Sequence, residues 1–509
     1  MSPDQPHDRE SYVGAIDQGT KGTRFLVFDQ RGRVRANAYE RHEQLRPSRG
    51  WLEHHPREIW ADAQAVVERG LDRAEIEPTQ LSALGVTNQR ETTLVWDRES
   101  GKPIYNAIVW SDRRTTDRIE ELDTQSKERV REKTGLEPDA YFSATKLAWI
   151  LDNADSETGQ RSLRRRAEAG ELCFGTVDSW LVYNLTGEHA TDVSNASRTM
   201  LYDIHELAWD DELLEEFAIP RAMLPDVRPS SAVYGRTNAD GVFGTEIPVA
   251  GVVGDQQAAL LGQSCFDPGD VKATYGTGTF ALLNTGPEPV DSNGGLLTTV
   301  GYQLDGEPVQ YALEGASFTT GGAIDWLETV GVVDGPVEIE SLARGLDSSG
   351  GVYFVPAFDG LGTPHWDPRA RGTILGLTRG TTREQLVRAT LEAVGHQTRQ
   401  LIEAMAAATE WAVEPIHVDG GVVKNDFFCQ LQADLLRTEL HRPAVEATTA
   451  LGAAFAAGLA VDYWDDVADL PEWELGKRFE SGGDPEEIDR QYGRWSDAVE
   501  RTREWAVER

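Results

Sequence analysis

The stretch GAIDQGTKGTRFLVF, residues 14–28, predicts a β-hairpin whose turn suits an anion. Two apolar runs enclose a turn of Gly, Thr and cationic side chains, and the second run again has the pattern of a strand. A P-loop instead needs Gly-x-x-x-x-Gly-Lys, then Ser or Thr, and a helix. Gly19 and Gly22 are too close together for that pattern, so the stretch predicts a phosphate-binding hairpin and not a P-loop.

A second stretch repeats this pattern later in the chain. Residues 269–286, GDVKATYGTGTFALLNTG, are again an apolar strand, a Gly-Thr turn and an apolar strand. Each half also has an apolar strand that runs through Asp and Gly into a helix, within 247–263 and 416–436. Backbone N–H groups at such helix starts favour phosphate. The repetition predicts an internal duplication, with α/β domains at 1–254 and 255–509.

Size and charge limit the classes of partner. A chain of 509 residues exceeds the ~250–300 over which one core keeps growing, so two or three domains are expected. The net charge of -36 arises from 85 acidic and 49 basic residues spread along the chain, which disfavours nucleic acid and anionic membranes as partners. Only 8 of the basic residues are lysine, and this composition predicts a protein kept soluble in a halophilic cytosol.

Export, membrane insertion and disulfide bonds are not expected. The N-terminus is polar, and the apolar stretch 450–461 is shorter than the ~20 residues that span a bilayer. Cys173, Cys265 and Cys429 are far apart and form no C-x-x-C pair. We therefore expect a cytoplasmic protein, with residues 462–509 as a solvated helical cap that carries no chemistry.

Two aspartates at strand ends are candidates for metal and proton chemistry. Asp17, beside the first turn, is placed to hold Mg²⁺ while Thr20 and Arg24 reach a nucleotide phosphate. Asp255 follows an apolar strand, where a carboxylate can take a proton from a substrate hydroxyl during phosphoryl transfer. The alternatives are that Asp17 caps a hairpin turn and that Asp255 is a helix N-cap.

Further candidates suit a polyhydroxyl ligand. Arg90 and Glu91, adjacent after a strand, offer donors and acceptors in a small space, although adjacent charges are commonly a surface ion pair. Trp110, Tyr141 and Phe280 lie in nearby segments, with core packing as the alternative.

Glycine-rich turns suggest a nucleotide site in the second half. Gly321 and Gly322, then Gly420, Gly421 and Asn425, would let the backbone approach an adenosine or its phosphates. The alternative is that these residues only form helix–turn junctions.

Together these motifs resemble one family. In this order and spacing the chain contains DQGT, GVTNQRET, AIVW, YFSATKLAWIL, NASRTMLYDI, GDQQAAL, YGTGTF, VPAFDGLGTPHWDPRARGTILGLTRG and VDGGVVKND. They resemble the FGGY family of carbohydrate kinases, and TNQRET and NASRTML are typical of its glycerol-phosphorylating members. The resemblance runs from about residue 12 to about residue 464.

The resemblance implies a fold and a reaction. Two actin-like (ribonuclease H-like) α/β domains would enclose an active-site cleft, with one phosphate hairpin in each domain. The reaction would transfer phosphate from ATP to glycerol, giving sn-glycerol 3-phosphate, with ATP and Mg²⁺ as cofactors. By analogy alone, the protein would be a homodimer or a homotetramer.

The resemblance also implies roles for individual residues. Glycerol hydroxyls would be bound by Arg90, Glu91, Tyr141, Asp255 and Gln256, with Trp110 and Phe280 beside the carbon skeleton. Asp255 would be the catalytic base, and Asp17 with Asp255 would position Mg²⁺. The nucleotide would be bound by Thr20, Lys21, Gly22, Arg24, Thr277, Gly321, Asp325, Gly421 and Asn425.

Two departures from the family pattern affect the nucleotide site. Lys21 and Gly22 replace small hydroxyl residues, and Asp325 replaces an amide. We expect Lys21 to direct its charge toward a nucleotide phosphate and Gly22 to let the backbone approach it.

Two alternative functions remain open. The first is a kinase of the same fold for another polyol or sugar, such as xylulose or gluconate. Arg90 and Glu91 with Trp110 and Phe280 would crowd such a ligand. The second is a non-catalytic, actin-like nucleotide switch, which would not need a polyol-binding set.

Overall fold

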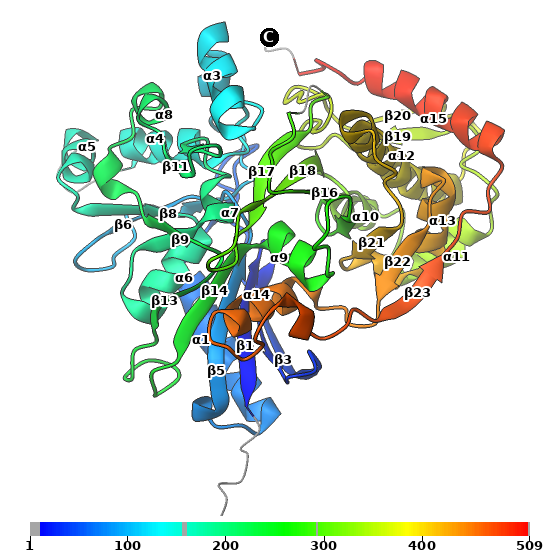
Figure 1. The fold of residues 1–509 in the computed structure, drawn as a ribbon. Helices are drawn as coiled ribbons and strands as arrows, with labels where there is room; N and C mark the ends of the chain where they lie inside the picture. Colours follow the sequence, from blue (N-terminus) through cyan, green and yellow to red (C-terminus); the bar gives the residue numbers. More distant parts are fainter. Residues whose placement is uncertain (1–10, 155–159, 292–293, 507–509) are drawn as a thin grey trace, which may run out of the picture.

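Two large β-sheets, one in each half of the chain, organise the computed structural model (Figure 1). The structure describes residues 11–154, 160–291 and 294–506. The strands of the first sheet are β1 (Tyr12–Gly19), β2 (Gly22–Phe28), β3 (Val34–Arg41), β5 (Leu81–Asn88), β13 (Ser231–Arg236) and β14 (Pro248–Gly254). Those of the second are β15 (Val271–Tyr275), β16 (Thr279–Gly286), β17 (Leu297–Tyr302), β18 (Gln310–Ser317), β21 (Ile416–Asp419), β22 (Leu440–Pro443) and β23 (Leu475–Phe479).

The two sheets share one topology. Their orders are β13-β14-β5-β1-β2-β3 and β17-β18-β16-β15-β21-β22-β23. Without β13, β17 and β23, the orders are β3-β2-β1-β5-β14 in the first sheet and β18-β16-β15-β21-β22 in the second. When the strands of each sheet are numbered along the chain, both orders read third, second, first, fourth, fifth. In each sheet the first two strands form an antiparallel hairpin and the fourth pairs with the first in parallel. The predicted hairpins and the actin-like α/β fold are therefore confirmed.

Two short helices rich in small residues separate the sheets. They are α9 (Asp255–Gly262) and α14 (Thr448–Leu459). Helix α14 packs on β1, β5 and β14 of the first sheet, and α9 contacts β15 and β16 of the second. A Cβ atom on Gly262 would lie 1.9 Å from Thr448 O, and one on Gly452 would lie 1.8 Å from Ala258 O. The two helices can pack this closely only because both positions are glycine.

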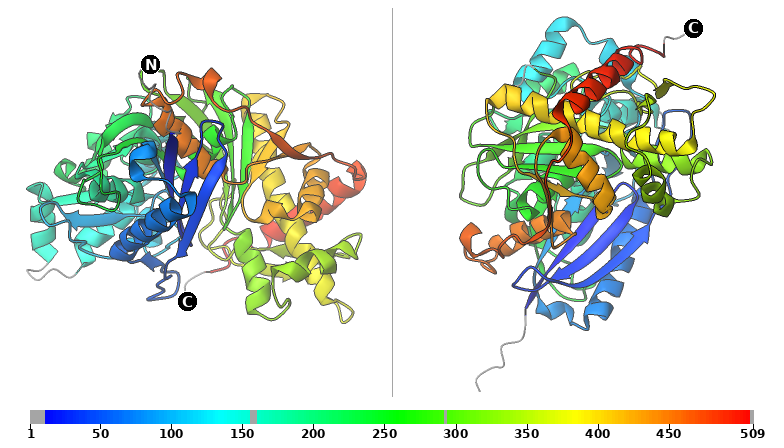
Figure 2. Two further views of the ribbon diagram at one scale, coloured as in Figure 1. Left: turned by 90° about the horizontal axis from the view of Figure 1, so that it is seen from below. Right: turned by 90° about the vertical axis from the view of Figure 1, so that its right-hand side faces the viewer.

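Longer helices cover the outer faces of the sheets. Helix α1 (Pro56–Ala74) packs on β2 and β3. The second sheet is covered by α12 (Arg383–Thr409) and α13 (Asp426–Leu436). Helix α15 (Pro485–Glu500) lies across α12, as the right-hand view of Figure 2 shows.

Smaller elements complete both halves. In the first half they are β4 (Glu53–His54), β6 (Leu94–Asp97), β7 (Ala107–Ile108), α2 (Thr116–Glu120), α3 (Thr124–Thr134), α4 (Ser143–Asn153), α5 (Gln160–Glu168), β8 (Leu172–Gly175), α6 (Val177–Thr186), β9 (Ala190–Asp192), α7 (Val193–Ala196), β10 (Tyr202–Asp203), β11 (Ala208–Trp209), α8 (Asp211–Glu216) and β12 (Asp226–Arg228). In the second half they are α10 (Gly321–Thr329), α11 (Pro336–Arg344), β19 (Tyr353–Val355) and β20 (Thr373–Leu375).

The C-terminal segment is more integrated than the sequence predicts. Strand β23 pairs with β22 at the edge of the second sheet. The side chain of Trp495 in α15 is buried, and its indole Nε1 donates to Phe354 O at 2.9 Å. The prediction of a solvated cap is therefore wrong for this face of α15, because the segment supplies an edge strand and core side chains.

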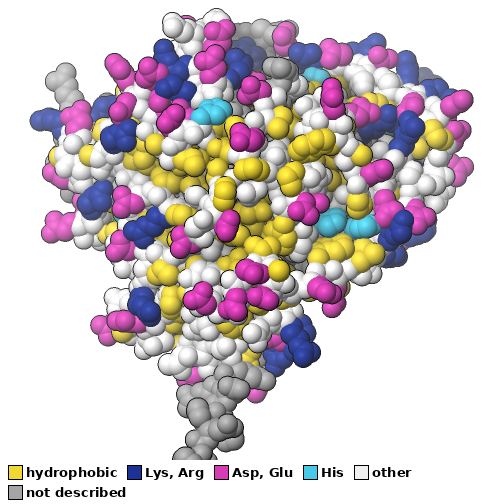
Figure 3. Space-filling model, in the orientation of Figure 1, with side chains coloured by type: hydrophobic (Ala, Val, Ile, Leu, Met, Phe, Trp, Pro, Cys, Tyr) yellow, Lys and Arg dark blue, Asp and Glu magenta, His cyan; other side chains and the backbone are white. Residues whose placement is uncertain are grey.

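The surface and the cysteines follow the composition. Figure 3 shows acidic side chains scattered over one face, with Lys and Arg between them. Cys173, Cys265 and Cys429 are buried and free. Within the described ranges, no helix has both the length and the apolar character needed to cross a bilayer.

Candidate active site

A small pocket lies where the two hairpin turns meet, and both halves of the chain contribute to it. Its volume is about 170 Å³, below the range usual for drug-sized ligands. It is lined by Asp17, Thr20, Arg90, Glu91, Trp110, Tyr141, Asp255, Gln256, Thr274, Gly276, Thr277, Gly278, Phe280 and Thr449. The structure thus brings together all seven residues that the family resemblance assigned to the substrate, together with Asp17, Thr20 and Thr277.

The first hairpin places a carboxylate and a hydroxyl at the pocket. Strands β1 and β2 pair to the ends, with Gly19 opposite Gly22 and Asp17 opposite Arg24. Burial raises the pKa of the Asp17 carboxyl, and the positive charge of Arg24 opposes this shift. Trp110 Nε1 donates to Thr20 Oγ1 at 2.9 Å, so the turn hydroxyl is held toward the pocket.

The backbone of this turn is anchored from behind. His42 Nε2 lies 3.0 Å from Thr20 O, and Gln44 Nε2 donates to the same oxygen at 2.9 Å. A Cβ atom on Gly22 would lie 2.2 Å from Glu40 O in β3. Packing against β3 therefore already requires glycine at position 22, independently of any nucleotide.

Asp255 sits at the junction of a strand and a helix, as predicted. Strand β14 ends at Gly254, which is the N-cap of α9, so Asp255 is the first helical residue and not the cap. Its side chain is 27% exposed, and Oδ1 lies 3.4 Å from Arg90 Nε. Burial raises the pKa of the Asp255 carboxyl to about 7, where Arg90 and Lys272 lower it and Glu91 and Asp17 raise it further.

Arg90 and Glu91 are deeply buried, so the interpretation as a surface ion pair is wrong. Each side chain is 1% exposed. Glu91 has φ of 57°, a left-handed conformation that costs energy outside glycine and often marks functional sites. Arg90 Nη2 donates to Tyr141 OH at 3.2 Å, which joins two of the predicted substrate-binding residues.

Aromatic rings from both halves close the pocket. Trp110 lies edge-to-face with Tyr141 at 5.7 Å and with Phe280 at 5.9 Å between ring centroids. All three rings belong to a hydrophobic core, so the alternative of core packing is confirmed. They also line the pocket, and their contact with a substrate stays a prediction.

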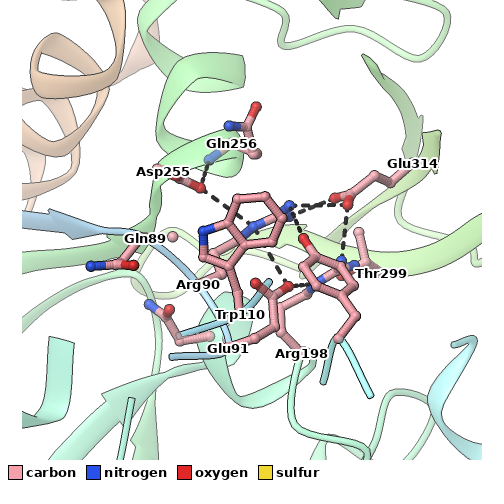
Figure 4. Close-up of polar contacts among 12 residues, drawn as sticks. Gln89, Arg90, Glu91, Trp110, Arg198, Asp255, Gln256, Thr299 and Glu314 are labelled. Carbon is pink, nitrogen blue, oxygen red and sulfur yellow. Dashed lines mark hydrogen bonds and ion pairs between the residues drawn. The ribbon is translucent and has the colours of Figure 1, made fainter. Parts of the chain in front are cut away.

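Three buried charged residues near the pocket had no predicted role. Arg198 and Glu314 form ion pairs with Glu91 and Arg90, as Figure 4 shows. Lys272 Nζ contacts Gln256 Oε1 and donates to Thr274 Oγ1 at 3.0 Å. Burial lowers the pKa of Lys272 to about 8. Arg198 lies in the quoted NASRTM motif, and the lone charges of VKATY and YALEGAS interrupt apolar strands, which was the available signal.

The other predicted nucleotide residues lie outside the pocket lining. Gly321 N donates to Gly276 O at 3.0 Å, so α10 begins against the second hairpin turn. Asn425 caps α13, accepting from Phe428 N at 3.1 Å. Gly421, next to β21, faces open space, and Arg24 is exposed. The structure leaves a nucleotide role for these residues as a prediction.

Lys21 and Asp325 contact each other instead of lying apart. Lys21 Nζ lies 2.7 Å from Asp325 Oδ2, which joins the first hairpin turn to α10 of the second half. The two side chains are 47% and 59% exposed. Both were expected at the nucleotide, so the ion pair gives each a protein partner that the sequence did not predict.

The donor set of the pocket fits Mg²⁺. Asp17 and Asp255 both line the pocket, and the pKa of Asp255 is raised first by burial and further by the negative charge of Asp17. Carboxylate oxygens with water are the ligands that Mg²⁺ prefers, and a cation would relieve this repulsion.

Comparison with known proteins agrees with this geometry. Residues 12–262 match the FGGY family of carbohydrate kinases, N-terminal domain, and residues 271–461 match its C-terminal domain. A glycerol kinase from Haloferax volcanii is 61% identical over 98% of this chain and 99% of that protein. The crystal structure of Plasmodium falciparum glycerol kinase with ADP has a TM-score of 0.85 at 33% identity, over 98% of this chain and 99% of that one.

A more distant structure shares the fold alone. Gluconate kinase from Lactobacillus acidophilus has a TM-score of 0.83 at 18% identity, over 97% of this chain and 98% of that one. With both family domains matched and relatives aligned over nearly the full length, the chain belongs to the FGGY family of carbohydrate kinases.

Proposed function

We propose that the protein phosphorylates glycerol with ATP, giving sn-glycerol 3-phosphate and ADP. The observation that carries the proposal is the small pocket in which Asp255 lies beside Arg90, Glu91, Tyr141 and Gln256. Its three carboxylates and its amide and hydroxyl groups suit a ligand held by hydrogen bonds. The high identity to the glycerol kinase of Haloferax volcanii supports the same substrate.

In this mechanism Asp255 is the general base. Its carboxylate accepts the proton of the terminal hydroxyl while that oxygen forms its bond to the γ-phosphorus and ADP leaves. A pKa of about 7 places Asp255 near neutral pH, where a base combines availability with proton affinity. Arg90 and Glu91 hold the other hydroxyls, and Trp110 and Phe280 exclude water from the carbon skeleton.

The phosphates would lie between the two turns. Thr20 of the first hairpin and Thr277 of the second both face the pocket. Asp17 and Asp255 would hold Mg²⁺, which neutralises charge on the transferring phosphoryl group when bound. The adenosine would extend toward Gly321, Gly421 and Asn425, at the edge where β15 and β21 end.

Other members of the family act on larger substrates, and this gives the second candidate. The pocket volume of about 170 Å³ and its ring walls favour a three-carbon ligand over xylulose or gluconate. A non-catalytic nucleotide switch would not need the buried groups that are proposed to bind a polyol.

A coupled ADP-release assay tests the proposal. Glycerol, dihydroxyacetone, xylulose and gluconate are each supplied with ATP and Mg²⁺ in molar KCl, because the acidic surface predicts a protein suited to concentrated salt. The related enzyme from Haloferax volcanii comes from a halophilic archaeon. We expect ADP release to depend on glycerol. Release that depends on xylulose or gluconate, or on no polyol, would overturn the proposal.

We also propose a cellular location and an oligomeric state for the enzyme. We expect a cytoplasmic homodimer or homotetramer, which light scattering of the purified protein can check. The division of the chain at Gly254 remains a proposal as well, since α14 from the second half packs on the first sheet.

A further inference from the structure

Arg90 has almost all of its hydrogen-bond donors occupied by protein groups. A guanidinium carries five N–H donors. Nη1 donates to Glu314 Oε2 at 2.5 Å and to Gln257 Oε1 at 3.2 Å. Nη2 donates to Glu314 Oε1 at 3.0 Å and to Tyr141 OH at 3.2 Å. Only Nε–H remains, and it faces Asp255 at 3.4 Å.

Glu314 is fixed in this position from the second sheet. It lies in β18, its side chain is fully buried, and Oε1 also accepts from Arg198 Nη2 at 2.9 Å. Arg198 Nε donates in turn to Glu91 Oε1 at 2.7 Å, and Glu91 lies 3.8 Å from Arg90 Nε. Figure 4 shows the resulting ring, in which positive and negative groups alternate. Because both side chains are buried, separating Glu314 from Arg90 would leave two unpaired charges away from solvent, which is strongly unfavourable.

An arginine with its two terminal nitrogens free would behave differently. Such a guanidinium binds carboxylate or phosphate through two parallel hydrogen bonds. Glu314 already occupies that bidentate edge of Arg90. A ligand in the pocket therefore meets one N–H donor, which matches a hydroxyl oxygen and not a carboxylate.

The charges near the pocket act in the same direction. The ring of Arg90, Arg198, Glu91 and Glu314 has no net charge. Asp17 and Asp255 add two carboxylates and buried Lys272 adds one cation, so acidic groups remain in excess at the pocket, which disfavours an anionic organic substrate. Replacing the Glu314 carboxylate by an amide would leave one acceptor for the two terminal nitrogens of Arg90, which frees part of its bidentate edge, and would add one net positive charge.

We propose that Glu314 is a specificity-determining residue, which makes Arg90 select neutral polyols and reject three-carbon acids of the same size. Glu314 does not line the pocket and is therefore a positioning residue. It acts by accepting hydrogen bonds from both terminal nitrogens of Arg90. The inference rests on the proposed function, because it names the substrate class of the same site.

The test uses D-glycerate, which differs from glycerol by a carboxylate in place of a terminal CH₂OH. Its affinity is measured by calorimetry on the full chain without nucleotide, and as inhibition of glycerol turnover. We expect wild-type protein to bind D-glycerate far more weakly than glycerol. In Glu314→Gln we expect D-glycerate to bind at least about tenfold more tightly, with a raised KM for glycerol. A merely structural role would not produce this gain of binding.

Two further variants separate specificity from folding. Glu392 pairs with Arg388 in α12 at 2.8 Å and is 6% exposed, so Glu392→Gln removes a similarly buried ion pair away from the pocket. We expect no gain of D-glycerate binding there. The double variant Arg198→Gln with Glu314→Gln restores a neutral ring and guards against misfolding of the single variant. It should show a smaller gain than Glu314→Gln, because no net positive charge is added.

Each outcome decides the inference. Wild-type protein that binds D-glycerate as tightly as glycerol overturns it, whether or not any variant folds. A folded Glu314 variant with unchanged D-glycerate affinity also overturns it. Absence of glycerol turnover in the wild type would instead reject the proposed function, while calorimetry still reports the effect of Glu314.

Discussion

The two hairpins that meet at the pocket share one backbone pattern but carry different chemistry. When their turns are matched at Gly19 and Gly276, Asp17 of the first hairpin corresponds to Thr274 of the second. Two residues earlier, buried Ala15 corresponds to buried Lys272. The first hairpin thus brings a carboxylate to the pocket, and the second brings a hydroxyl above a buried cation.

The turns are also supported differently. The carbonyl of Thr20 is held by side chains, His42 and Gln44. The carbonyl of Thr277 instead accepts from the backbone N–H of Thr320, at 2.8 Å. The two hairpins thus share a scaffold but differ in charge, which fits the proposed metal-binding role of Asp17 in the first hairpin only.

The largest effect is expected at the junction between the two halves. Asp255→Asn removes the proposed base but keeps the shape and the hydrogen bond from Gln256 N. We expect kcat to fall by about 100-fold or more while glycerol binding is largely kept. Single-turnover kinetics measure the rate of phosphoryl transfer, and calorimetry measures the affinity for glycerol. Near-normal turnover would remove Asp255 from the base role.

A pair of matched substitutions tests the asymmetry of the hairpins directly. Asp17→Asn should lower kcat by about 10–100-fold, the range for residues that hold a metal through outer contacts, and added Mg²⁺ should restore part of the loss. Thr274→Val removes one hydrogen-bonding hydroxyl and should cost about two- to tenfold, with no response to Mg²⁺. Initial rates across an Mg²⁺ titration measure both. Equal losses, or equal responses to Mg²⁺, would show that the two hairpins are used alike.

Local patterns explain why the hairpins were predictable from the sequence. An apolar strand, a Gly-Thr turn and another apolar strand specify antiparallel pairing within about twenty residues of chain. The position of Asp255 after β14 follows from a similar local pattern. The pocket-lining roles of Arg90, Glu91 and Gln256, by contrast, came from the family resemblance more than from spacing.

Contacts between distant segments could not be predicted in this way. Arg198 meets Glu314 across 116 positions of the chain, and no local period specifies such a pairing. The burial of Arg90 and Glu91 depends on this ring, which is why their sequence also suited a surface ion pair. The sequence of α14 showed only an apolar stretch. The packing of this helix depends on the close contact between Gly452 and Ala258 of α9, which the sequence does not show.

The smallest expected effect concerns the contact that joins the two halves at the surface, Lys21 with Asp325. Exposed ion pairs contribute little to stability and are screened by salt. If Lys21 directs its charge toward a nucleotide phosphate, as the sequence predicts, the two partners must act on ATP in opposite directions. Lys21→Thr should raise the KM for ATP, whereas Asp325→Asn should lower it by freeing the lysine and removing a negative charge.

Both changes should stay below about fivefold in dilute buffer and shrink in molar KCl, because exposed charges are screened there. Steady-state KM values for ATP at two salt concentrations measure them, and kcat serves as the internal control. Changes of the same sign in the two variants would instead mean that the ion pair acts as a unit, which holds the first hairpin turn against α10. An unchanged KM in Lys21→Thr would leave the lysine with no role at the phosphate.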